Sequence, residues 1–170
     1  LISEAKGFSL PTVAEVLPST GVISTSLEGE YGWNYEMSLK AYLFKTKLSL
    51  ELTGFYFNLK NALVQRRDIS GADYFINAGD TKQSGIEFHA DYKGYIGGDF
   101  FRHFTIRCDV MLNNFHYGSF IKGADDFSGK KLPSVPSSVL SLLGDIYLKN
   151  GIYFRTSYYG SSSIYLNDAN

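Results

Sequence analysis

The sequence predicts an all-β chain folded as an antiparallel meander of long strands. Apolar and polar residues alternate with a period of two along most of the 170 residues, which puts them on opposite faces of a strand. The alternating segments come in pairs joined by tight turns, as in β-hairpins. Longer polar segments separate the pairs, so we expect three hairpins in series.

The first hairpin is predicted over 35–57. Apolar residues occupy the odd positions of 35–43, and after a tight connection at 45–47 three leucines alternate with Ser49, Glu51 and Thr53. The apolar character then continues through the aromatic run 55–57.

The second hairpin is predicted over 86–112 and the third over 140–158. In the second, alternating segments flank a glycine-rich turn at 94–98. In the third they flank Lys149-Asn150-Gly151, and Asn-Gly is the strongest short signal for a hairpin.

The links between the hairpins are long and polar. Residues 63–79 carry a charged run at 66–68, and residues 118–138 carry several glycines and prolines. Near the start of the chain, Thr12 and Glu15 have the spacing of a capping box, which predicts one helical turn. Short turns that alternate with long connections are typical of outer-membrane barrels.

Two environments fit the apolar side of these strands: a second sheet in water, as in a β-sandwich, or lipid. The apparent strands of about 10–13 residues exceed the soluble average and suit a membrane. The opposite side carries charges, which a water-filled or plugged lumen accepts and a dry core does not. We therefore expect part of a transmembrane β-barrel. Aromatic residues also gather near the predicted strand ends, as they do at membrane interfaces: Trp33, Tyr35, Phe55, Tyr56, Phe57, Tyr74, Phe75, Phe115, Tyr117, Phe120, Tyr158 and Tyr159.

Composition excludes several classes of protein. Lys and Arg number 16 and Asp and Glu 17, so the net charge of −1 argues against a nucleic-acid partner. The single cysteine, Cys108, excludes a disulfide framework and an all-cysteine metal site. Phosphate-binding, zinc and nucleophile-elbow motifs are all missing, so we expect no enzyme activity, cofactor or metal site. The chain opens at Leu1 without a basic leader, and we expect it to be cut from a longer precursor.

Four segments resemble motifs of the TonB-dependent outer-membrane receptors. Residues 7–16 (GFSLPTVAEV) are similar to the family's GFRAPTLAEL, and 34–40 (NYEMSLK) to its NYELGLK. Residues 77–87 (NAGDTKQSGIE) are similar to NAGKTRHRGLE, and 132–136 (LPSVP) to LPGVP. The order and spacing also agree, although Ser9 stands where the family usually has Arg.

The resemblance implies that residues 1–170 form one partial, C-proximal piece of the receptor barrel. This piece has about seven strands of the roughly 22 in such plugged barrels. The TonB box, the plug domain and the last, aromatic-ended strand are absent from the sequence.

The resemblance also implies active transport in the outer membrane of a Gram-negative cell. The cargo expected is a ferric siderophore, with cobalamin, haem or glycans as alternatives. The expected partners are outer-membrane lipid, TonB through the missing plug domain, and the small-molecule cargo. The segment itself contributes barrel wall, lumen lining and external loops.

Arg66 and Arg67 are the candidate ligand-binding residues. They lie at the border of a strand and a presumed external loop, and arginine forks suit the carboxylate, catecholate or phosphate groups of an anionic chelate. The alternative is a solvated or lipopolysaccharide-contacting pair. Asp125 and Asp126, in the longest loop, have oxygen ligands for a hard cation or form a solvated loop tip.

His89 alternates with Glu87 and Asp91, so we expect it on the lumen side. There it has either a proton-linked role or that of a lining residue exposed to water. His89, His103 and His116 are not spaced as a ligand set. Cys108 is expected on the apolar side as a small hydrophobic residue.

Two competing functions remain open at this point. One is a soluble β-sandwich that binds carbohydrate through exposed Tyr residues and Trp33; the other is a secreted β-rich enzyme. A second sheet packed on the apolar side would support the sandwich, and a bare apolar belt would support the barrel. The deciding positions are Leu39, Leu50, Ile106 and Leu142.

Overall fold

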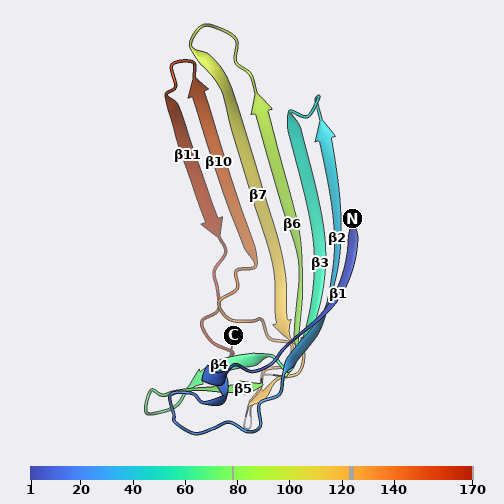
Figure 1. Cartoon of the computed structure of the whole chain (residues 1–170), viewed down its shortest axis with the longest axis vertical. Coiled ribbons are helices and arrows are strands. Elements are labelled where there is room, and N and C mark those ends of the chain that lie inside the picture. The colour runs from blue at the N-terminus through green and yellow to red at the C-terminus, as the bar shows by residue number, and fades with distance from the viewer. Residues whose placement is uncertain (78, 123–124, 170) are drawn as a thin grey trace.

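The computed structural model describes residues 1–77, 79–122 and 125–169, and it contains one large antiparallel sheet. Seven strands follow one another in the order β1-β2-β3-β6-β7-β10-β11, which makes the sheet a meander (Figure 1). The long strands confirm the three predicted hairpins. Their bounds are β1 Ile2–Ser9, β2 Glu30–Leu43, β3 Leu48–Lys60, β6 Thr81–Gly94, β7 Phe101–Tyr117, β10 Ser138–Leu148 and β11 Tyr153–Ser161.

The strand register sorts the side chains onto two faces. Glu51 is paired with His89 and His89 with Asp109, so charged residues meet across strands on what we call the polar face. Their chain neighbours lie on the other side, where Leu52 is paired with Phe88. This second side is the apolar face. It holds Leu39, Leu50, Leu52, Ile86, Phe88, Ile106, Leu112, Leu142 and Ile146.

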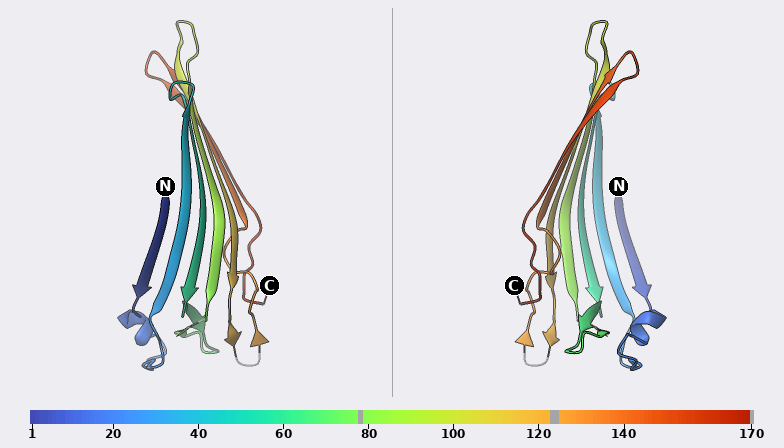
Figure 2. Two further views of the ribbon diagram at one scale, coloured as in Figure 1. Left: turned by 90° about the vertical axis from the view of Figure 1, so that its right-hand side faces the viewer. Right: turned by 90° about the vertical axis from the view of Figure 1, so that its left-hand side faces the viewer.

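The apolar face is bare. Seen nearly edge-on in Figure 2, the sheet is a single curved layer. Leu39 keeps 58% of its surface exposed, Ile106 48% and Leu142 38%, while Leu50 is half-buried between its neighbours. Within the described residues, the only other sheets are two short two-stranded ones. The alternative of a β-sandwich is therefore wrong, because no second sheet covers these side chains.

Three tight turns lie together at one end of the sheet, which we call the short-turn end (top of Figure 1). Phe44, Lys45 and Thr46 have φ angles of 51°, 54° and 68° between β2 and β3. Gly98 and Gly151 adopt φ angles of 112° and 89° in the other two turns. Glycine has no Cβ to oppose this left-handed conformation, which explains its place there.

The opposite end, the long-connection end, is more ordered than the sequence predicted. The link expected as a polar loop at 63–79 contains the hairpin β4 (Leu63–Arg67) and β5 (Asp73–Asn77). A smaller hairpin joins β8 (Ile121–Lys122) and β9 (Asp125–Asp126). The predicted helical turn is confirmed as α1 (Val13–Val16), with the Glu15 carboxylate accepting a bond from the Thr12 backbone N–H at 2.6 Å.

The small buried core lies at this end and not under the sheet. Tyr117 and Phe120 are each 2% exposed, and Val64, Ile76, Phe127 and Leu132 pack against them. The core therefore holds the long connections together and leaves both sheet faces open. No helix among the described residues is long and apolar enough to cross a membrane.

Candidate functional site

The centre of the polar face is a network built on His89. Its Nδ1 lies 2.6 Å from Asp109 Oδ1, and its Nε2 lies 2.5 Å from Asp91 Oδ2. With both carboxylates ionised, both contacts are hydrogen bonds only when each ring nitrogen carries a proton, so the geometry suits an imidazolium. Arg107 Nε donates to the other oxygen of Asp91 at 2.9 Å. The prediction that His89 shares a face with Asp91 is confirmed.

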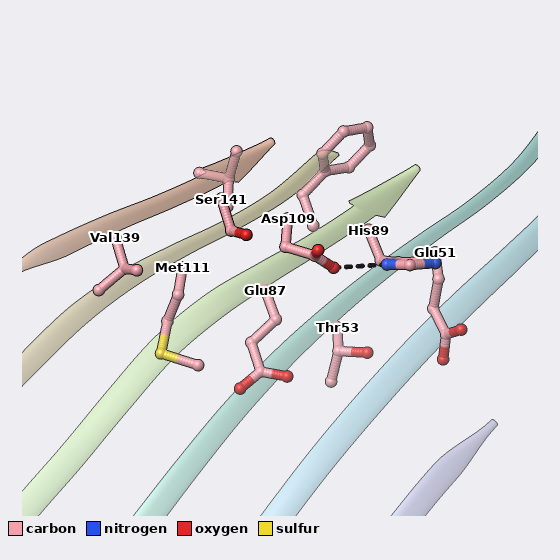
Figure 3. A pocket seen from close by; sticks show the side chains of 10 residues that line it. Glu51, Thr53, Glu87, His89, Asp109, Met111, Val139 and Ser141 are labelled. Carbon is pink, nitrogen blue, oxygen red and sulfur yellow. Dashed lines mark hydrogen bonds and ion pairs between the residues drawn. The ribbon is translucent and has the colours of Figure 1, made fainter. Parts of the chain in front are cut away.

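This network borders a shallow hollow of about 240 Å³ (Figure 3). Glu51 and Thr53 reach it from β3, Glu87 and His89 from β6, and Asp109 from β7. Figure 3 shows the imidazole of His89 turned toward Asp109, with the carboxylates of Glu51 and Glu87 on either side. The charged side chains of the lining are three carboxylates and His89. The apolar residues of the lining are Phe88, Val110, Met111 and Val139.

Two further ion pairs flank the network across neighbouring strands. Lys40 Nζ lies 3.0 Å from Glu51 Oε2, and both side chains are substantially exposed. Arg155 donates two hydrogen bonds of 2.7 and 3.1 Å to the carboxylate of Asp145, which is only 5% exposed. Such bidentate pairs have the most specific geometry among ion pairs. A surface so charged requires water or another polar surface against it.

A second cluster, which we call the loop lock, joins three segments at the long-connection end. A terminal nitrogen of Arg66 lies 2.9 Å from Asp168 Oδ2, and each side chain is 12% exposed. The Tyr117 hydroxyl donates to the other oxygen of Asp168 at 2.7 Å. The Arg66 guanidinium also lies over the Phe120 ring, 5.2 Å from its centroid. The loop lock thus ties β4 and the end of β7 to residues 162–169.

The structure separates the predicted arginine pair, because neighbours on a strand face opposite ways. Arg66 turns inward to Asp168, whereas Arg67 is 68% exposed and donates from Nε to Asp73 Oδ1 at 2.8 Å. This hydrogen bond from Arg67 holds the pKa of the Asp73 carboxyl below its usual range. Sequence reasoning missed Asp168 and Tyr117, because no local pattern links them to Arg66.

The other candidates stand apart from these clusters. Asp125 and Asp126 are exposed on β9. A hydrogen bond with the Ser128 side chain lowers the pKa of Asp126. In the part of the chain that the structure describes, no three His, Cys, Asp or Glu side chains are placed to hold a metal ion. Cys108 is paired in register with Ala90 and Leu142, which confirms its place on the apolar face.

The aromatic residues divide between the faces, although we expected them to form one interfacial belt. Trp33 and Tyr35 stack on the apolar side, with ring centroids 6.4 Å apart. Phe55 and Phe115 meet edge-on at 6.1 Å on the polar side. The belt explanation therefore fits only part of the set. The consecutive run 55–57 hid this division, because an unbroken aromatic stretch shows no period.

Residues 3–170 match the protein family described as TonB dependent receptor-like, beta-barrel. No curated protein sequence matches the chain significantly.

Proposed function

The chain belongs to the TonB-dependent receptor β-barrel family, and from this premise we propose that it forms part of the barrel wall of an importer of ferric siderophores. The family places it among the transport receptors of the outer membrane, which are not enzymes. The bare apolar face carries this proposal for the wall. A surface of exposed leucine and isoleucine suits hydrocarbon, and the charged face behind it suits a wet or plugged lumen.

The asymmetry of the connections supports an orientation. Outer-membrane barrels have short periplasmic turns and long extracellular loops. We therefore propose that the short-turn end faces the periplasm and that β4, β5 and the loop lock face the cell exterior.

The choice of cargo rests on Arg67. Its side chain is 68% exposed at the proposed outer end, and its guanidinium is held by one carboxylate, that of Asp73. An anionic chelate can replace Asp73 as the partner of this fork. Arg66 has the supporting role, since Asp168 and Phe120 fix it beneath the same hairpin. TonB acts on this cargo through the plug domain of the complete receptor.

The test measures import by the complete receptor, expressed from a plasmid in a strain whose own copy of the gene is deleted. Radioactive ferric siderophores of the catecholate and carboxylate classes are supplied one at a time, together with cobalamin and haem. We expect uptake of a ferric chelate, and Arg67→Gln to raise the half-saturating concentration severalfold while the amount of receptor stays unchanged. Uptake of cobalamin or haem alone would overturn the cargo, and unchanged kinetics in the variant would overturn the role of Arg67.

A further inference from the structure

The short-turn end of the sheet is basic, whereas the long-connection end carries charges of both signs. The short-turn end has one acidic residue, Asp99, in its three turns and the adjoining strand ends. At the long-connection end, acidic residues such as Glu15 and Glu28 are matched by basic residues such as Arg66, Arg67 and Lys130. The basic side chains of the short-turn end are Lys45, Lys47, Lys93, Arg102 and Lys149.

An apolar groove of about 540 Å³ runs into this basic end. It lies between β7, β10 and β11, and Gly144 creates it. Gly144 is paired with Ile106 on one side and Thr156 on the other, so a row of side chains is interrupted on the apolar face. Ile146 and Phe154, which are 41% and 62% exposed, form walls of the groove.

The groove and the charges meet at the turns. Ile96, from the turn between β6 and β7, closes one end of the groove. Arg102 lies two residues before the groove residue Phe104, where the register of β7 against β10 shifts by one residue. Lys149 follows at the end of β10, and its backbone N–H donates to the Phe100 carbonyl at 3.0 Å, which ties the two turns together.

We propose that this groove binds an anionic phospholipid, with an acyl chain along Gly144 and the headgroup phosphate between Arg102 and Lys149. The inference rests on the proposed function, because it requires the apolar face to contact the membrane. Charge complementarity selects the ligand, since basic residues at a membrane surface attract anionic headgroups. A zwitterionic phospholipid fits the groove equally well but gains less from the two cations, because its own ammonium group offsets the charge of its phosphate.

A second hollow on the same face serves as an internal comparison. It surrounds Gly54, has nearly the same size at about 520 Å³, and is bordered by Tyr35, Met37 and Tyr56. Its charged neighbours are Glu4 and Glu36, and no basic residue borders it within the described residues. We expect it to accept hydrocarbon without preference for an anionic headgroup.

The experiment uses native mass spectrometry of the complete receptor, purified in detergent with equal amounts of phosphatidylglycerol and phosphatidylethanolamine. The wild-type receptor is expected to retain phosphatidylglycerol preferentially. In the double variant Arg102→Gln, Lys149→Gln, the affinity for phosphatidylglycerol is expected to fall about fivefold for each basic side chain removed. Gly144→Leu fills the groove and is expected to reduce retention of both lipids.

Matched controls remove the same charge and add the same volume elsewhere on the apolar face. Lys6→Gln with Lys82→Gln acts at the long-connection end, and Gly54→Leu fills the comparison hollow. Both are expected to keep the preference for phosphatidylglycerol.

A wild-type receptor that retains both lipids equally overturns the inference, as does an equal loss in variants and controls. These outcomes are independent of the proposed function, which fails instead if the receptor is absent from outer-membrane fractions or imports nothing.

Discussion

The ring of Phe55 on β3 occupies the place that a side chain on Gly85 of β6 would take. The two residues are register partners, and a Cβ built on Gly85 would lie 2.6 Å from Phe55 Cζ and 2.7 Å from the Leu112 carbonyl oxygen. An aromatic ring laid over a glycine in the next strand secures their pairing. We expect Gly85→Ala to destabilise the receptor by about 1–3 kcal/mol, because the backbone oxygen cannot move aside.

Urea unfolding of the complete receptor in lipid vesicles measures this effect. The matched control is Gly54→Ala on β3, where an added Cβ meets nothing within 4 Å. If the urea concentration at half unfolding fell equally in both variants, the contact between Gly85 and Phe55 would have no special role.

Leu142 and Ser141 provide a direct test of what contacts each face. They are neighbours in the middle of β10, with Leu142 on the apolar face and Ser141 beside Asp109 on the polar face. We expect Leu142→Arg to cost about 2–4 kcal/mol, as charges facing lipid near the bilayer midplane do. Ser141→Arg is expected to leave stability nearly unchanged, because its side chain reaches water and a carboxylate. Unfolding in vesicles compares the two; equal costs would contradict the assignment of the faces.

The loop lock is expected to control the order of residues 162–169. Asp168→Asn removes the charge that partners Arg66 in a site where both are 12% exposed, at an expected cost of about 1–3 kcal/mol. Tyr117→Phe removes one hydrogen bond and keeps the ring on Phe120, so about 1 kcal/mol is expected. Hydrogen exchange of the 162–169 amides reports both changes. Asp73→Asn, in the exposed pair with Arg67, is the control that should leave these amides protected.

Acid is expected to loosen the tip of the β4–β5 hairpin. The Ser70 hydroxyl and the Ala72 N–H donate to Asp68 Oδ1 at 2.6 and 3.0 Å, and these bonds lower the pKa of Asp68. A lowered folded-state pKa contributes stability above the ordinary aspartate value of about 4, and this stability is lost as the pH falls through the folded value. The tip should therefore stay ordered from neutral pH down to about pH 4 and become mobile below it.

A spin label at the hairpin tip measures this mobility. The label is attached at Ile69→Cys in a Cys108→Ser background, which removes the natural thiol. Asp68→Asn in the same background should already be mobile at neutral pH and change little on acidification. A wild-type tip that loosens between pH 7 and pH 5 would disagree with the direction of the pKa shift.

The hairpins were predictable because their signals are local. Period-two alternation and turn residues such as Asn150-Gly151 lie within a few positions of one another. β1 was not predicted, because Ile2–Ser9 lies at a sheet edge, is exposed throughout and shows no clean alternation. β4 and β5 were missed because five-residue strands around a charged turn resemble a polar loop.

The site was less predictable than the fold. His89 could be assigned to the polar face from its neighbours in sequence, but its contact with Asp109 depends on the register of β6 and β7. The partner of Arg66 lies near the other end of the sequence, so only the folded chain reveals Asp168. Residues that contact each other through pairing of distant segments leave no local pattern.

The charges around His89 also protect the sheet against errors of assembly. A slip of two residues between β6 and β7 preserves the alternation of apolar and polar sides, so hydrophobicity alone cannot detect it. In the native register Asp91 is opposite Arg107. A slip in one direction sets Asp91 opposite Asp109, and it also brings Lys93 opposite Arg107.

A slip in the other direction sets Glu87 opposite Asp109 and His89 opposite Arg107. Like charges directly across a ladder repel each other, so a slip of two residues in either direction carries a penalty that the native register avoids. The charged residues of the polar face therefore select the native register of β6 and β7, whereas the apolar side chains of these strands would accept either slipped register.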